Sequence, residues 1–121
     1  MTYLITDDSR MGRKMMIKSL KELIKEEDEI IEATNGLEAI EQYKKYNPKI
    51  CFMDLTMPVM DGFEATKEIY NYDNNAKIII VSADIQETSK LKAKESGAIG
   101  FINKPINQNN LSKMLSGLGF I

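Results

Sequence analysis

Five short apolar runs recur along the chain. Each is four or five residues long and rich in β-branched or aromatic side chains, which is typical of a buried β-strand. We therefore predict five strands, over Tyr3–Thr6, Glu29–Glu32, Ile50–Met53, Lys77–Val81 and Ile99–Ile102.

The segments between these runs carry apolar residues at helical spacing. The first segment has the apolar stripe Met16, Leu20, Leu23 and Ile24, with Lys14, Lys18, Lys21 and Glu22 on its other sides. Further helices are expected over Gly36–Tyr46, Phe63–Tyr70, Gln86–Ser96 and Asn107–Leu115.

Strand and helix alternate five times, which predicts an α/β fold with one doubly wound, five-stranded parallel sheet and helices on both faces. At 121 residues the chain is long enough for one core but not for two. The first strand begins almost at Met1 and the last helix runs close to the C-terminus. We therefore expect a single domain over residues 1–121, with no effector domain.

Composition excludes several function classes. Lys and Arg number 16 against 18 Asp and Glu, a net charge of -2, so no broad basic field suggests direct nucleic-acid binding. No apolar stretch approaches the roughly 18 residues of a membrane span, and no signal-peptide pattern opens the chain, so we expect a cytoplasmic protein. The chain has no histidine, which removes His-based triads and His-ligated zinc. Its one cysteine, Cys51, is expected to be a small buried hydrophobe.

Polar residues follow the predicted strands at the end where open parallel sheets bind ligands. They are Asp7 and Asp8 after the first strand, Asp54 after the third, Ser82 after the fourth and Lys104 after the fifth. Taken alone, an Asp-Asp-Ser sequence before a helix is more typical of helix capping. Three carboxylates, a hydroxyl and an ammonium group converging on one edge are not explained by capping.

Such a cluster supports specific chemistry. Three close carboxylates repel one another unless a cation lies among them, and oxygen ligands suit Mg²⁺. A carboxylate at a rigid strand end can attack phosphorus and form an aspartyl phosphate. Mg²⁺, Lys104 and Ser82 would then neutralise or hydrogen-bond the phosphoryl oxygens. Behind Asp54, Pro58 and the pair Asp61-Gly62 are expected to shape the loop, with Asp61 as the N-cap of the next helix.

The residues that carry a family resemblance are Asp7-Asp8, the stretch MDLTMPVMDG around Asp54, Ser82-Ala83 and Lys104-Pro105. Together they resemble the receiver domain of two-component response regulators over essentially the whole chain. The resemblance implies a flavodoxin-like fold with the strand order 2-1-3-4-5. It also implies a Lys104–Pro105 bond in the cis form, which costs least before proline.

The resemblance also assigns roles to single residues. Asp54 becomes the phosphoacceptor, Asp8 a direct Mg²⁺ ligand, and Asp7 a ligand through water. The Thr56 backbone carbonyl becomes the remaining protein ligand. Lys104 would pair with Asp54 before phosphorylation and with the phosphoryl group afterwards.

The output switch of the family also has matching residues. Ser82 would move toward the phosphoryl group, and Phe101 would turn inward behind it. Phe101 stands where chemotaxis regulators have tyrosine, so any contact that needs the phenolic oxygen is absent. The small residue Ala83 would let the loop from Ser82 to Ile85 move.

Two surfaces are candidate docking sites. A sensor histidine kinase or His-phosphotransfer protein is the expected phosphodonor, and Met11 and Met15 on the first helix are candidate contacts for it. A downstream protein target is expected on helix four, strand five and helix five, where the candidate basic residues are Lys90, Lys92, Lys94 and Lys113.

Several interpretations remain open from the sequence. The terminal stretch KMLSGLGFI and the single-domain layout are similar to the chemotaxis regulators, but a phosphorelay intermediate or phosphate sink has the same layout. A haloacid-dehalogenase phosphatase needs a general acid where this chain has Thr56, and a flavodoxin needs a hydroxyl- and glycine-rich loop in place of Asp7-Asp8. A pseudo-receiver lacks one of the key residues, and none is missing here. We expect no enzymatic activity beyond the chain's own phosphorylation and dephosphorylation.

Overall fold

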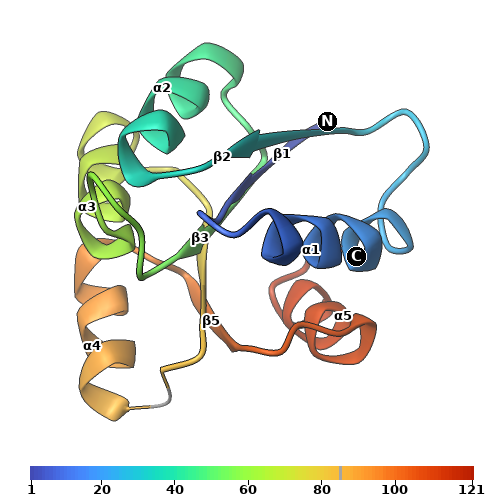
Figure 1. Ribbon diagram of the computed structural model, residues 1–121. Helices are drawn as coiled ribbons and strands as arrows, with labels where there is room; N and C mark the ends of the chain where they lie inside the picture. The colour runs from blue at the N-terminus through green and yellow to red at the C-terminus, as the bar shows by residue number, and fades with distance from the viewer. Residues whose placement is uncertain (85) are drawn as a thin grey trace.

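The computed structural model describes residues 1–84 and 86–121, and strands alternate with helices along them as predicted (Figure 1). The strands are β1 (Thr2–Thr6), β2 (Glu29–Ala33), β3 (Ile50–Asp54), β4 (Ile78–Ser82) and β5 (Gly100–Asn103). The helices are α1 (Arg10–Lys21), α2 (Gly36–Tyr46), α3 (Gly62–Tyr72), α4 (Glu87–Ser96) and α5 (Gln108–Gly117). None of these helices has the length and apolar character needed to span a membrane. The expected switch loop includes Ile85, which lies outside the described residues.

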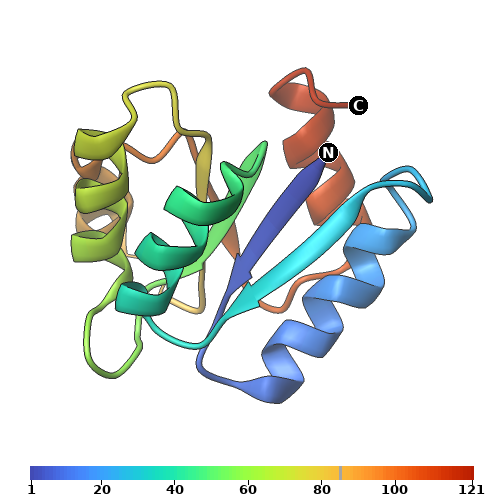
Figure 2. The same ribbon diagram turned by 90° about the horizontal axis from the view of Figure 1, so that it is seen from above.

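The sheet has the order β2-β1-β3-β4-β5 with every pairing parallel, which confirms the predicted fold class. Helices α1 and α5 cover one face, and α2, α3 and α4 cover the other (Figures 1 and 2). Each face has its own buried apolar cluster. Ile5, Met16 and Leu111 belong to the α1–α5 side, whereas Leu4 and Ile69 belong to the opposite side.

The central strands β3 and β4 are buried along their whole length, because helices cover both faces of a parallel sheet. Both run one residue past their predicted ends. Asp54 is in register with Val81, and Ser82 with Asn103. These two polar residues therefore belong to the sheet, which fixes the position of their backbones.

Helix α1 ends earlier than its apolar stripe predicts. Leu23 and Ile24 lie in the turn after the helix, where both amides donate to the Leu20 carbonyl, at 2.9 and 3.1 Å. Both side chains still pack against the cluster on the α1–α5 side. The pattern thus predicted burial correctly, but the helix end is set by a tightened last turn that apolar spacing does not reveal.

Two expectations about single residues are confirmed. The Asp61 side chain accepts a hydrogen bond from the Glu64 amide at 2.9 Å, so Asp61 is the N-cap of α3. Cys51 is fully buried, and this burial raises the pKa of its thiol to about 12.

Gly62 lets α3 begin directly behind Asp54, because a Cβ at this position would overlap the Asp54 backbone carbonyl oxygen. We expect Gly62→Ala to lower the free energy of unfolding by at least about 2 kcal/mol, since a strand backbone yields less readily than a side chain. Gly117→Ala is the matched control. Gly117 ends α5, and a Cβ there would meet nothing within 4 Å, so that change should be neutral or stabilising by up to about 1 kcal/mol. Urea unfolding distinguishes the two, and equal stabilities would contradict this explanation.

Candidate functional site

Three carboxylates meet at the carboxyl edge of the sheet. Asp7 and Asp8 follow β1, Asp54 closes the adjacent β3, and one oxygen from each lies within 4.8 Å of the others. Lys104, which follows β5, reaches the same place. Its Nζ lies 3.1 Å from Asp7 Oδ2 and 3.5 Å from Asp54 Oδ1. The structure thus brings together four of the residues selected from the sequence.

Asp7 and Asp8 have different environments despite being neighbours. Asp7 is buried, its Oδ1 accepts from the Ser9 amide at 2.8 Å, and its Oδ2 accepts from Lys104. Asp8 is exposed. Since both oxygens of Asp7 already have donors, Asp8 is the carboxylate more accessible to an incoming cation.

Two residues that the sequence interpretation missed hold Asp7 in place. Arg13 of α1 donates from Nη1 to the Asp7 backbone carbonyl at 2.8 Å and from Nε to Glu32 of β2 at 2.9 Å. Gly12 leaves room for the carboxylate, because a Cβ there would lie 2.5 Å from Asp7 Oδ2. A glycine inside a helical pattern usually has a packing reason, so Gly12 was a detectable signal.

Burial and neighbouring charges oppose each other at Asp54. Its Oδ1 accepts a hydrogen bond from the Leu55 amide at 2.9 Å, and only 8% of the residue is exposed. Burial raises the pKa of Asp54, Lys104 lowers it, and the Asp7 charge raises it again, with a net result of about 6. For Lys104 burial lowers the pKa, but Asp54 and Asp7 outweigh it and raise the pKa above its ordinary value. Lys104 therefore stays charged between the two carboxylates.

Ser82 is buried at the end of β4, next to the site. Its hydroxyl accepts from the Asp84 amide at 3.1 Å, and its carbonyl accepts from the Lys104 amide at 2.8 Å. The bond from Lys104 to the following Pro105 is cis. Ser82 thus connects the loop after β4 to the segment that carries the site ammonium.

The candidate surface residues lie in three places. Met11 and Met15 of α1 are 66% and 47% exposed. Phe101 is half-buried on β5, and Lys90 Nζ lies 6.0 Å from its ring centroid. Phe101 and Lys113 line one surface groove. Lys92 lies elsewhere, with Nζ 4.5 Å from the Phe63 ring of α3, and Lys94 is exposed on α4. Only Lys90 and Lys113 of the four lysines are thereby brought to Phe101.

The donor set fits a hard divalent cation. Asp7, Asp8 and Asp54 offer only oxygen atoms, and Thr56 is exposed in the loop directly after β3. Few carboxylates and open positions for water are the arrangement that Mg²⁺ favours. The residues present therefore fit Mg²⁺.

Residues 3–116 match the response regulator receiver domain, and the chain belongs to this family. It is similar to chemotaxis protein CheY of Thermotoga maritima, with 44% identity over 114 residues that cover 93% of this chain and 92% of the relative. Chemotaxis protein CheY of Halobacterium salinarum is 42% identical over the same length and coverage.

Solved structures agree with this assignment. A chain in the CheX–CheY–BeF3–Mg complex of Borrelia burgdorferi aligns with a TM-score of 0.84 at 31% identity, covering 97% of this chain and 88% of the other. Vibrio cholerae chemotaxis protein CheY4 aligns with a TM-score of 0.85 at 29% identity, covering 96% of each chain.

The raised pKa of Asp54 makes a prediction about stability without metal. In the folded state the Asp54 carboxyl stays protonated up to a pH of about 6, whereas in the unfolded chain it loses its proton at about pH 4. The free energy of unfolding therefore falls as pH rises from about 4 to about 6, because ionisation of Asp54 is less favourable in the folded state. Above that range the loss of stability is complete and constant. In chelator-treated protein at neutral pH, Asp54→Asn should be stabilised by about 1–2 kcal/mol after allowance for solvent screening.

The gain should disappear below about pH 4, where both states of Asp54 are protonated. Lys104 keeps Asp7 as a partner in this variant, so no buried ammonium is left unpaired. Thermal melts of parent and variant across this pH range measure the difference. A variant no more stable than the parent at neutral pH would show that burial does not raise the pKa of Asp54.

Proposed function

We propose that this chain is a phosphoryl-accepting response regulator in which Asp54 takes a phosphoryl group from a phosphohistidine donor. The observation that supports the proposal is the convergence of four residues at one sheet edge. Oxygens of Asp7, Asp8 and Asp54 lie within 4.8 Å of one another, and Lys104 pairs with Asp7 and Asp54. The donor is a sensor histidine kinase or a His-phosphotransfer protein, since this chain has no histidine of its own.

Asp54 is the nucleophile in this mechanism. One of its carboxylate oxygens forms a bond to phosphorus as the P–N bond of the donor breaks, and the electron pair leaves with the imidazole nitrogen. Lys104, 3.5 Å from Asp54 Oδ1, is placed to neutralise the transferred group. Asp8, Asp54, the Thr56 carbonyl and, through water, Asp7 would hold Mg²⁺, which supplies further charge neutralisation when bound.

Ser82 is the candidate relay from the site to the surface. Its hydroxyl now accepts a hydrogen bond from the Asp84 amide. After phosphorylation of Asp54, the same hydroxyl would donate a hydrogen bond to a phosphoryl oxygen. Phe101 on the neighbouring strand is half-buried, so turning inward would bury more of its ring. A switch requires such an element with two arrangements that the new charge stabilises differently.

The signalling role that we propose is that of a cytoplasmic chemotaxis regulator. The relatives named chemotaxis protein CheY, from a bacterium and an archaeon, support it. The exposed Met11 and Met15 would contact the phosphodonor. The face around Phe101, with Lys90 and Lys113, would bind the target. Lys92 and Lys94 would contribute only from the other positions that they occupy on α4.

Mg²⁺ together with beryllofluoride, which mimics a bound phosphoryl group, should raise the melting temperature of the protein. Ligand at about 100 times its dissociation constant stabilises a folded state by about 2.7 kcal/mol. Asp8→Ala should remove most of the rise, whereas Glu68→Gln, a change to an exposed carboxylate of α3, should keep it. If neither Mg²⁺ nor beryllofluoride changes the melting temperature of the parent protein, the proposed site is ruled out.

Ser82→Ala should uncouple the site from Phe101. In the parent protein, beryllofluoride and Mg²⁺ should shift the ring resonances of a selectively labelled Phe101. In Ser82→Ala the ligands should still raise the melting temperature, but most of the shift at Phe101 should be lost. Ser116→Ala, an exposed change on α5, is the control and should behave as the parent. An undiminished Phe101 response in Ser82→Ala would exclude Ser82 as the relay.

A further inference from the structure

Helix α1 carries a row of cations along its exposed side. Four of them recur at intervals of four, four and three residues, which places them on one helix face, and a fifth follows in the turn beyond. We name this set the α1 basic stripe: Arg10, Lys14, Lys18, Lys21 and Lys25. All five are exposed, and within residues 1–84 and 86–121 none of them forms an ion pair.

The stripe contrasts with the charge of the remaining chain. Outside it, eleven Lys and Arg face 18 Asp and Glu, so the stripe is a locally basic surface on a protein whose remaining charge is net acidic. A local field of this kind selects partners and speeds their association.

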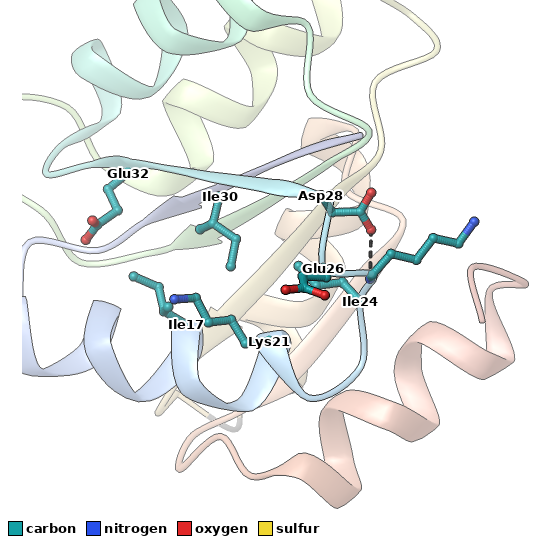
Figure 3. A pocket seen from close by; sticks show the side chains of 8 residues that line it. Ile17, Lys21, Ile24, Glu26, Asp28, Ile30 and Glu32 are labelled. Carbon is teal, nitrogen blue, oxygen red and sulfur yellow. Dashed lines mark hydrogen bonds between the residues drawn. The ribbon is translucent and has the colours of Figure 1, made fainter.

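A groove of about 630 Å³ runs beside the second half of the stripe, between α1 and the edge strand β2 (Figure 3). Its apolar lining consists of Ile17 of α1, Ile24 of the following turn and Ile30 of β2. Figure 3 shows Ile30 pointing from β2 toward α1. Lys21 and Lys25 also line it, so apolar surface and unpaired positive charge lie next to each other.

The acidic residues of this groove are mostly already paired. Asp28 accepts from the N-terminal ammonium at 3.2 Å and from the Lys25 amide at 3.0 Å, and Glu32 accepts from Arg13 at 2.9 Å. Glu26 is the remaining acid of the lining. Within the groove and along α1, the charge left for a partner is therefore positive as far as Lys25, where the acidic residues 26 to 29 begin.

We propose that this α1–β2 groove docks an acidic amphipathic helix of a partner protein. Carboxylates spaced one turn apart on that helix would pair with the α1 basic stripe, and apolar side chains beside them would enter the groove between Ile17, Ile24 and Ile30. Recognition of this kind combines buried apolar anchors with complementary charge.

A helix fits better than a nucleic acid or a lipid surface. The acidic run from residue 26 to residue 29 follows the stripe directly and would repel a phosphate backbone that continued past it. The helical part of the stripe, from Arg10 to Lys21, spans about 16 Å, and Lys25 follows in the turn beyond. A partner helix of about three turns matches that length.

The groove is distinct from the two pockets of the proposed phosphoryl switch. The groove shares no lining residue with the pocket around Asp54 or with the groove beside Phe101. Binding should therefore be the same with and without beryllofluoride and Mg²⁺. A partner could therefore bind at the α1–β2 groove whether or not Asp54 is phosphorylated.

The test uses a panel of synthetic helical peptides that share glutamates at positions i, i+4, i+7 and i+11 and vary in the adjacent apolar residues. Titration of ¹⁵N-labelled full chain should shift amide resonances of α1, the following turn and β2. Affinity of the best peptide should fall as salt rises from about 50 to 300 mM, because exposed pairs are screened.

The double variant Lys21→Glu/Lys25→Glu should lose about tenfold in affinity for that peptide, since each exposed pair contributes a factor of a few and reversal adds repulsion. Lys67→Glu/Lys77→Glu carries the same charge change on exposed positions elsewhere and should bind as the parent. Ile24→Ser should weaken binding without altering its salt dependence.

The proposal is overturned if no peptide of the panel binds, or if the Lys21 and Lys25 changes leave affinity unaltered. It is also overturned if duplex RNA or phosphatidylserine vesicles bind more tightly than every peptide and lose that binding in the same double variant. Because the readout needs no phosphoryl group, failure here leaves the role of Asp54 intact, and failure of Asp54 to react leaves this test unaffected.

Discussion

Mutual repulsion of three carboxylates is the constraint on which the rest of this structure depends. Asp7, Asp8 and Asp54 bring oxygens within 4.8 Å of one another at the edge of the sheet. Like charges at this distance raise the cost of ionisation unless a cation is present. The Lys104 ammonium supplies one permanent positive charge, and it lies closer to Asp7 than to Asp54. One ammonium among three carboxylates leaves the cluster with a net negative charge, which favours the binding of a divalent cation.

The fold keeps this unfavourable cluster in place with rigid backbone. Asp54 is part of a fully buried strand, α3 starts against its carbonyl because Gly62 has no side chain, and Arg13 ties the carbonyl of Asp7 to β2. A carboxylate so held cannot swing into solvent to relieve the repulsion. In the proposed mechanism, the same rigidity would fix Asp54 where an incoming phosphorus atom must be, and positioning is most of what phosphoryl transfer requires of a protein.

Sequence patterns predicted the parts of this arrangement that follow from topology. Parallel strands place their carboxyl ends along one edge, so Asp7, Asp54 and Lys104 had to be near one another once the strands were identified. The role of Arg13 was not predictable, because it depends on the distance between α1 and the edge strand. The sequence also grouped Lys92 with Lys90, although helical geometry turns residues two positions apart to different sides, and Lys92 lies over Phe63 of α3.

The most direct test of the central claim is transfer from a small P–N compound to the site carboxylate. Protein incubated with phosphoramidate and Mg²⁺ should gain the mass of one phosphoryl group. After acid quenching and borohydride reduction of the acyl phosphate, fragmentation of the chain should locate the modified residue at Asp54. Chelation of the metal should suppress the gain, and Asp54→Asn should abolish it. A phosphoryl group on any other residue, or no gain in the parent protein, would contradict the account.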